Sequence, residues 1–312
     1  MASNLLRLGN KCNEKCLFCT VAKDNEKELA TEEAKNAIRA IAKQGRAISF
    51  TGGEPTIRPD LPELIECAKN AGFEKIELQS NAVLLGKKTV QNLKKAGLNH
   101  AFIALHSHKK EISEKLTGVK DSFEKTVSGI KNLLDAGIPT TVSHVITTMN
   151  HKELAEFAGF VEKNFQGINS IYFGLARPNG RCAENAWLAP RLSDIEPFLE
   201  KAAEYCRRKK IFFEIEGFPL CHTIGFEENN VESRRLLEEP VVYIGSIETK
   251  ENIHKKGIQR TKAKGRQCGL CWLGKLCCGV WKEYAELHGC LELFPQYADA
   301  KEIEARIRRH AQ

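Results

Sequence analysis

Short apolar runs alternate with amphipathic segments through the first two thirds of the chain. Residues 31–44 place Ala34, Ile38 and Ile41 on one face, which is the 3.6-residue spacing of a helix that packs against a core. The run Ala-Ile-Ser-Phe at 47–50 has the short apolar character of a buried strand. The same alternation predicts strands at 5–8, 75–79, 101–105, 140–146 and 170–174, and helices that begin at residues 60 and 121 or span 87–95, 151–164 and 193–208.

This order of elements predicts an α/β fold, because strands separated by helices pair into a parallel sheet with helical crossovers. About six β/α units are too few to close an eight-stranded barrel, so we expect a partial (β/α)6 TIM-like barrel. After residue 216, glycines, cysteines and charged stretches replace this pattern. We therefore predict a core domain over residues 1–216 and a small Cys-rich C-terminal domain over residues 217–312.

The composition is that of a globular protein, with 42% hydrophobic and 28% charged residues in 312. No apolar stretch approaches the roughly 20 residues of a membrane-spanning helix, and residues 1–8 do not resemble a signal peptide. We therefore expect a cytoplasmic protein without a membrane partner. The net charge of +7 includes a basic run at 250–266, which is typical of a solvated loop and alternatively of a surface that contacts RNA or an acidic peptide.

Twelve cysteines narrow the choice of function. In a reducing compartment, grouped cysteines hold metal more often than they form disulfides. Three lie close together near residue 12, and a second group lies after residue 220. Cys67, Cys182 and Cys206 stand alone, and for these we expect the role of small buried hydrophobes.

The front group has the spacing Cys12-x3-Cys16-x2-Cys19, in a loop after the first predicted strand. Three thiolates can hold three corners of a [4Fe–4S] cluster, whereas four-cysteine ligation would fill every corner. The iron left open could coordinate a substrate or a cofactor. A zinc site is the alternative, but it normally needs four ligands, and His100 and His106 are far along the chain.

The segment Cys-Asn-Glu-Lys-Cys-Leu-Phe-Cys at 12–19 resembles the cluster motif of the radical S-adenosylmethionine (SAM) superfamily. In that family, SAM chelates the open iron, and reduction of the cluster cleaves SAM to methionine and a 5′-deoxyadenosyl radical. Thr-Gly-Gly-Glu-Pro at 51–55, directly after a predicted strand, resembles the motif that binds the amino group of SAM. Glycines there would let the backbone approach a ligand closely.

Other contacts to SAM follow from the resemblance by position. Together with the two motifs, it implies that SAM is bound by Phe18, Gly52, Gly53, Glu54, Pro55, Ser80, Asn81 and Ser107. Phe18 would lie beside the adenine. Asn150 and Arg177 follow later strands and are looser candidates, for which a role as turn or surface residues is the alternative. His106 and His108 could transfer protons near the site or be structural.

The back group resembles the auxiliary-cluster modules called SPASM and Twitch. Its cysteines are Cys221, Cys268, Cys271, Cys277, Cys278 and Cys290. Trp281 stands where the SPASM pattern has a further cysteine, which favours one auxiliary [4Fe–4S] cluster. We expect its ligands to be Cys221, Cys268, Cys271 and Cys277, with Cys278 or Cys290 as alternatives for the fourth. A zinc ribbon is the other interpretation of these residues.

The leading hypothesis is a radical SAM enzyme that oxidises or cross-links a peptide or small-molecule substrate. The auxiliary cluster would accept an electron, and a flavodoxin- or ferredoxin-type protein would supply the reducing electron. One alternative is an RNA-modifying enzyme, which the basic run favours. Another is a molybdenum-cofactor-cyclase-like enzyme, although the Gly-Gly tail of that enzyme is not found at residues 307–312. The last is a non-catalytic iron–sulfur or zinc protein.

Overall fold

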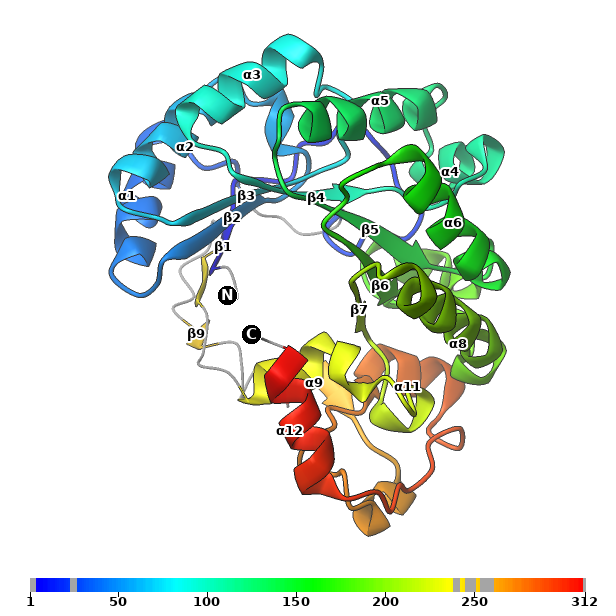
Figure 1. Cartoon of the computed structure of the whole chain (residues 1–312). Helices are drawn as coiled ribbons and strands as arrows, with labels where there is room; N and C mark the ends of the chain where they lie inside the picture. The colour runs from blue at the N-terminus through cyan, green and yellow to red at the C-terminus, as the bar shows by residue number, and fades with distance from the viewer. Residues whose placement is uncertain (1–3, 23–26, 238–241, 245–250, 253–260, 311–312) are drawn as a thin grey trace.

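The computed structural model describes residues 4–22, 27–237, 242–244, 251–252 and 261–310 (Figure 1). Seven strands pair in parallel and in chain order: β1 (Asn4–Arg7), β2 (Ala47–Thr51), β3 (Lys75–Ser80), β4 (His100–Ala104), β5 (Thr140–Ile146), β6 (Ser170–Leu175) and β7 (Phe213–Glu216). Beyond β1, β8 (Val242–Ile244) adds a parallel strand, and β9 (Glu251–Asn252) pairs antiparallel with β8.

The sheet curls around a central space and its outer face carries helices (Figure 1). The α-helices of the described chain are α1 (Thr31–Ala42), α2 (Leu61–Asn70), α3 (Lys87–Ala96), α4 (Lys110–Thr117), α5 (Ser122–Asp135), α6 (Leu154–Asn164), α7 (Arg181–Glu184), α8 (Leu192–Lys209), α9 (Val231–Leu237), α11 (Lys282–His288) and α12 (Ala300–His310). The curled sheet stays open between β7 and the β1 side. This confirms the predicted partial TIM-like barrel, with seven parallel strands in the curl instead of about six.

Strand β3 shows how the sequence directs side chains to the two faces of the sheet. Ile76 and Leu78 are buried and share the main hydrophobic core with Leu64 of α2. Glu77 and Gln79 alternate with them, so they lie on the concave face. Truncating a fully buried leucine such as Leu78 to alanine typically costs about 2–5 kcal/mol of stability. The apolar layer between sheet and helices therefore fixes the position of each strand end.

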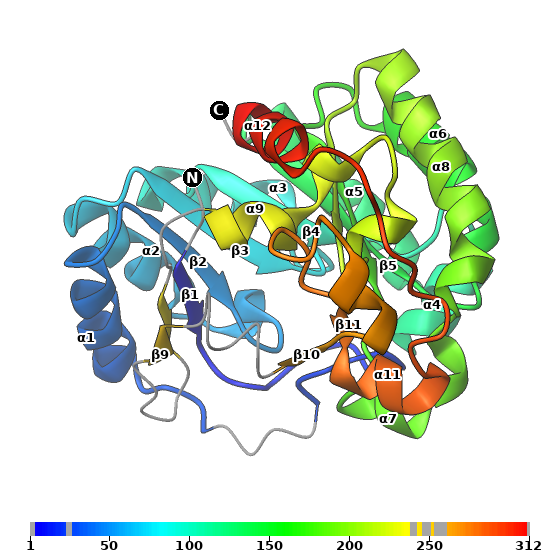
Figure 2. The same cartoon turned by 90° about the horizontal axis from the view of Figure 1, so that it is seen from below.

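The described residues from 217 to 310 form what we call the C-terminal module. It contains an antiparallel pair of short strands, β10 (Lys262–Ala263) and β11 (Val280–Trp281), and its own small apolar core. That core consists of Leu220, Leu273, Leu276, Ile303 and Ile307. Figure 1 shows the module next to β7 at the open side of the barrel, and Figure 2 shows the same arrangement from below. The domain boundary at residue 216 stays a prediction.

No helix in the described ranges has the length and apolar character that crossing a membrane requires. The cytoplasmic location stays a prediction.

His144 makes the stability of the fold depend on pH. It lies on β5, fully buried against Phe157, with ring centres 4.1 Å apart, and close to Phe173. Burial lowers the pKa of His144 well below its ordinary value of 6.5. The unfolded chain therefore takes up a proton below about pH 6.5 that the native state does not bind, and stability falls as the pH falls.

We expect this one group to lower the free energy of unfolding by about 2 kcal/mol between pH 7 and pH 5. The variant His144→Leu should lose that part of the pH dependence. Urea unfolding of the reduced apoprotein at the two pH values measures it. Equal pH dependence in the wild type and the variant would contradict the burial of a neutral imidazole.

Candidate active site

The front cysteine loop follows β1 and is fixed by backbone hydrogen bonds. The N–H groups of Lys15 and Leu17 donate to the carbonyls of Thr117 and Leu116, each over 2.9 Å. Both acceptors lie at the end of α4, a helix that the sequence patterns did not predict. The loop is therefore attached to the element that follows β4.

A second clamp on the loop comes from α7. The backbone N–H of Arg181 donates to the carbonyl of Cys19 over 2.8 Å, and its Nη1 donates to the carbonyl of Cys16 over 3.0 Å. Asn185 donates to the carbonyl of Leu17 over 3.3 Å. Sequence reasoning missed both residues, because their contacts span more than 160 positions. They orient the cysteines through the backbone.

The turn after β2 lies directly against the segment that precedes Cys12. Gly53 N–H donates to the carbonyl of Gly9 over 2.9 Å, and Glu54 N–H donates to that of Lys11 over 2.8 Å. A Cβ on Gly52 would lie 2.4 Å from the Gly9 oxygen, and one on Gly53 would lie 2.1 Å from the Lys11 oxygen. These glycines therefore permit a close approach of two backbone segments of the chain itself.

Glu54 joins the ends of β2 and β3. Its buried carboxylate accepts hydrogen bonds from Ser80 Oγ and from Asn81 N–H, each over 2.8 Å, and from Thr56 N–H over 2.9 Å. Asn81 Nδ2 donates in turn to Asn13 Oδ1 in the cysteine loop over 2.7 Å. The structure thus connects three predicted SAM contacts (Glu54, Ser80 and Asn81) to the cysteine loop in one hydrogen-bond network. Pro55 is buried beside them and begins a short 3₁₀ helix.

Phe18 and His106 form the apolar wall of the site. Phe18 is buried, and its ring meets that of His106 edge-on with centres 4.6 Å apart. Burial lowers the pKa of His106 to about 3, and its Nδ1 accepts the N–H of Val145 over 3.2 Å. A neutral, bonded imidazole suits a structural role better than proton transfer. Ser107 is also buried and accepts the N–H of Lys109 over 3.0 Å at the start of α4.

Three weaker candidates lie elsewhere or are occupied by other contacts. Asn150 donates to the carbonyls of His106 and Val145, so it supports the strand ends. Arg177 forms a bidentate pair with Glu283 of α11, over 2.6 and 3.2 Å. His108 lies 3.9 Å from Glu153 and packs near Phe160 of α6, away from the cysteine loop.

The front cysteines lie near the carboxylates of Glu14 and Glu54. Burial raises the pKa of Cys12 to about 11 and that of Cys16 well above its ordinary value, and the nearby charge of Glu14 adds to both. Burial also raises the pKa of Glu14 to about 7, with its carboxylate 3.5 Å from Cys16 Sγ. Sequence reasoning missed Glu14. Burial and the nearby carboxylates thus disfavour the thiolate form of the cysteines. A bound cation would displace the thiol protons and stabilise the thiolates, as metal binding to cysteine generally does.

Four of the six back cysteines line one hollow. Its lining includes Cys221, Cys268, Cys271 and Cys277, together with Lys264. Backbone N–H groups point at the sulfurs. Cys277 Sγ accepts from Gly279 over 3.3 Å and from Leu220 over 3.4 Å, and Cys271 Sγ accepts from Gln296 over 3.3 Å. Such bonds stabilise a thiolate and are common around iron–sulfur clusters.

Cys278 and Cys290, the alternatives for the fourth ligand, do not line this hollow. Cys278 is buried and its Sγ points to the carbonyl of Glu232, 3.7 Å away. Burial raises the pKa of Cys290, and the charge of the nearby Cys268 raises it further. The geometry therefore favours Cys277 as the fourth donor.

Neither group of the described cysteines has three sulfurs drawn together as closely as a bound zinc ion would hold them. Tetrahedral zinc, with Zn–S bonds of about 2.3 Å, holds its sulfurs about 3.8 Å apart. In the described chain, no three cysteine sulfurs lie within 4.8 Å of one another, in either the front or the back group. Three donors in front and four behind match a cluster with one open corner and a fully ligated cluster, respectively.

One part of the basic run is not a solvated loop. Lys262 is buried, with its Nζ 2.5 Å from the carboxylate of Glu232 and 3.3 Å from the centre of the Trp281 ring. The guanidinium of Arg177 lies 4.6 Å from the same ring. The expectation of a solvated loop is therefore wrong at Lys262, while residues 253–260 lie outside the described part of the chain.

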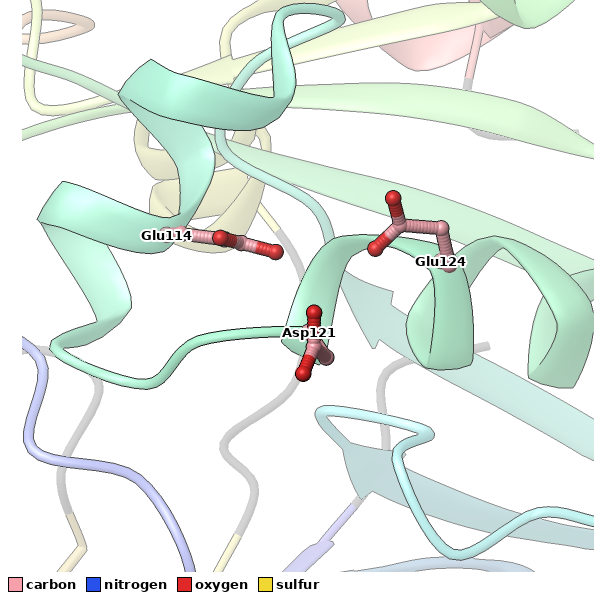
Figure 3. Close-up of side chains that lie close together, drawn as sticks. All are labelled: Glu114, Asp121 and Glu124. Carbon is pink, nitrogen blue, oxygen red and sulfur yellow. The ribbon is translucent and has the colours of Figure 1, made fainter.

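An acidic cluster at α4 and the start of α5 is paired with a lysine. Figure 3 shows Glu114, Asp121 and Glu124 turned toward one another. Lys110 Nζ lies 2.5 Å from Glu124, 3.7 Å from Asp121 and 3.8 Å from Glu114. This ammonium group already supplies the positive charge that the carboxylates need.

Comparison with known proteins identifies the core. Residues 6–162, half of the chain, match the family model of the Radical SAM superfamily. This chain belongs to the radical SAM superfamily. Its fold thus binds SAM and a [4Fe–4S] cluster, and the three front cysteines and the turn after β2 match that chemistry.

Several relatives by sequence share a name. A protein of Saccharolobus solfataricus called "Probable GTP 3′,8-cyclase" is 30% identical over 212 residues, which is 66% of this chain and 68% of the relative. A protein of Sulfurisphaera tokodaii with the same name is 31% identical over 204 residues, or 63% of each chain. The match thus spans about two thirds of these relatives.

Solved structures that contain bound S-adenosylmethionine share the fold over nearly the whole chain. SuiB of Streptococcus suis bound to S-adenosylmethionine superposes with a TM-score of 0.67 at 20% identity, over 95% of this chain and 76% of that one. The structure titled anSMEcpe with bound AdoMet gives 0.65 at 14% identity, over 99% and 92%. The likeness extends through the C-terminal module.

Gly53 offers a direct test of the contact between the turn and the cysteine loop. Gly53→Ala should push Lys11 and the loop apart, cost about 1–3 kcal/mol of stability and reduce SAM cleavage by about tenfold or more. Gly86→Ala is the matched control, because a Cβ at Gly86 meets nothing within 4 Å. Iron content, thermal unfolding and 5′-deoxyadenosine formation are the readouts. Equal behaviour of the two variants would contradict the importance of this contact.

Proposed function

We propose that the protein cleaves SAM reductively at a [4Fe–4S] cluster held by Cys12, Cys16 and Cys19, and that it oxidises its substrate with the help of a second cluster. The observation that carries the second part is the convergence of Cys221, Cys268, Cys271 and Cys277 on one hollow. When bound, the front cluster and SAM supply a 5′-deoxyadenosyl radical that abstracts hydrogen from the substrate.

The residues of the site would bind and orient SAM. Phe18 and His106 offer an apolar surface for the adenine and exclude water from it. Glu54 accepts several donors from the chain itself, and its Oε2, which receives the Asn81 N–H, has the capacity to accept one more hydrogen bond, such as one from an ammonium group. Ser107 and Asn81 lie at the ends of neighbouring strands, where the ribose and the methionine part would lie.

The back site would hold an auxiliary cluster of the SPASM or Twitch type. Four protein donors leave no open corner, which suits electron transfer rather than binding of a substrate. The N–H bonds to Cys271 and Cys277 favour the anionic state of the site. A flavodoxin- or ferredoxin-type protein would supply the electron that starts the reaction, and a peptide or small molecule would be the substrate.

Cyclisation of a purine nucleotide is the second candidate, and the comparisons by sequence support it better than peptide oxidation. The relatives at 30–31% identity are named for GTP 3′,8-cyclisation. In a cyclase of that kind, an open iron of the back cluster could anchor the substrate. The four-cysteine hollow speaks for a closed cluster instead, so GTP would have to bind by other contacts. RNA modification stays a weaker alternative, which the basic run alone favours; its described part includes the exposed Lys264 and Arg266.

Metal content and SAM cleavage test the proposal together. Protein reconstituted without oxygen should bind about eight irons, and the variant Cys12→Ala/Cys16→Ala/Cys19→Ala about four. With dithionite and SAM, only the wild type should form 5′-deoxyadenosine. Loaded wild-type protein that forms none would refute the proposed function, whereas zinc at the back site would refute only the auxiliary cluster.

The nature of the substrate is tested by adding GTP to the same reaction. We expect 5′-deoxyadenosine to form without stoichiometric conversion of GTP. Cyclised GTP, formed in proportion to 5′-deoxyadenosine, would instead establish the second candidate. In that case Cys277→Ala shows whether the fourth cysteine matters: a closed electron-transfer cluster predicts a loss of turnover of about tenfold or more in this variant, and an open substrate-binding cluster predicts little change.

A further inference from the structure

An apolar patch covers the surface beside the back cysteines. It consists of Leu270, Trp272, Leu291, Phe294 and Tyr297, which are exposed to between 38% and 96% of their full area. The ring centres of Trp272 and Tyr297 lie 5.7 Å apart. Side chains of this size are rarely left in water as a group unless the surface has a partner.

The patch is built directly on the segments that carry the cysteines. Leu270 and Trp272 flank Cys271, and Trp272 N–H donates to the carbonyl of Gln296 over 2.8 Å. The backbone N–H of the same residue, Gln296, donates to Cys271 Sγ. Phe294 both lines the hollow and reaches the surface. A protein docked here would therefore lie against the wall of the back site.

The charge on the segment that carries Leu270 and Trp272 is positive, while Asp299 is an exposed acidic residue two positions after Tyr297. Residues 261–281 contain no aspartate or glutamate, and Lys264, Arg266 and Lys275 of this segment are exposed. Lys264 also lines the hollow, where its charge lowers the pKa of Cys277 against the effect of burial. The acidic Glu292 nearby is paired with Arg191 over 2.9 Å. An apolar centre with a cationic rim is complementary to an acidic protein.

We propose that this patch is the docking surface of an acidic one-electron carrier protein of the flavodoxin or ferredoxin type. The proposal rests on the auxiliary cluster proposed above. A substrate radical that loses one proton to solvent and one electron to the protein becomes product, and the electron leaves here to reduce the oxidised carrier by one electron. A small patch suits such a partner, because transient redox complexes bury less than about 1,200 Å². A peptide substrate would instead need a surface that leads to the SAM site.

Binding of oxidised flavodoxin to the full chain with both clusters tests the proposal. We expect the charge variant Arg266→Glu/Lys275→Glu and the apolar variant Trp272→Ser/Tyr297→Ser each to weaken binding by about tenfold or more. They should slow electron transfer from the dithionite-reduced protein to flavodoxin by a similar factor. Salt should weaken binding to the wild type and have much less effect on the charge variant. The matched control is Lys87→Glu/Lys88→Glu on α3, with two exposed lysines far along the chain from the patch.

The outcomes separate this proposal from the function beneath it. Dithionite donates without docking, so SAM cleavage driven by dithionite should be the same in all variants. If that activity fails in the wild type, the proposed function is wrong. If it persists while both patch variants bind flavodoxin as the control does, the docking surface is wrong. Zinc at the back site, or variants that change only the KM for a peptide, would also overturn it.

Discussion

The close contact between the turn after β2 and the segment before Cys12 is the constraint on which the site depends. Two backbone hydrogen bonds, from Gly53 and Glu54, hold the segments together at a distance that excludes a Cβ. Because Glu54 also binds the end of β3 through Ser80 and Asn81, three neighbouring strands act on the loop at once. The loop also packs Phe18 and Leu17 into a small apolar cluster with Leu116 of α4. Its geometry is thus imposed by the strand ends together with α4 and α7.

The C-terminal module shares the main hydrophobic core with the barrel, because Phe226, Val280 and Tyr284 belong to the same buried cluster as Ile215 of β7. Arg177, after β6, pairs with Glu283 of α11 and contacts the ring of Trp281. Within the module itself, Lys262 pairs with Glu232 beside the same ring. A buried pair such as Lys262–Glu232 stabilises little on net, but removing one partner is costly because the other charge is left in a dry environment. The shared apolar core and the Arg177–Glu283 pair hold the module, and with it the back cysteines, against the barrel.

The fold was largely predictable from local patterns, because the strands of the barrel and most of its helices are encoded in short apolar periods. The helix α4 was missed because its eight residues are mostly polar, and β8 because it pairs with β1 across more than 230 positions. The cysteine motifs identified the front site. The roles of Glu14, Arg181 and Lys262 were not accessible, since each depends on a partner that only the folded chain brings near. Arg177 was proposed for SAM and instead pairs with Glu283, for the same reason.

Electron paramagnetic resonance of the reduced protein tests most directly whether the front cluster binds SAM while a closed cluster occupies the back site. The account predicts two [4Fe–4S]⁺ signals in the wild type, of which one shifts when SAM is added. The variant without Cys12, Cys16 and Cys19 should retain only the signal that SAM leaves unchanged. A spectrum in which no signal responds to SAM, or in which the remaining signal of the variant responds, would contradict the account.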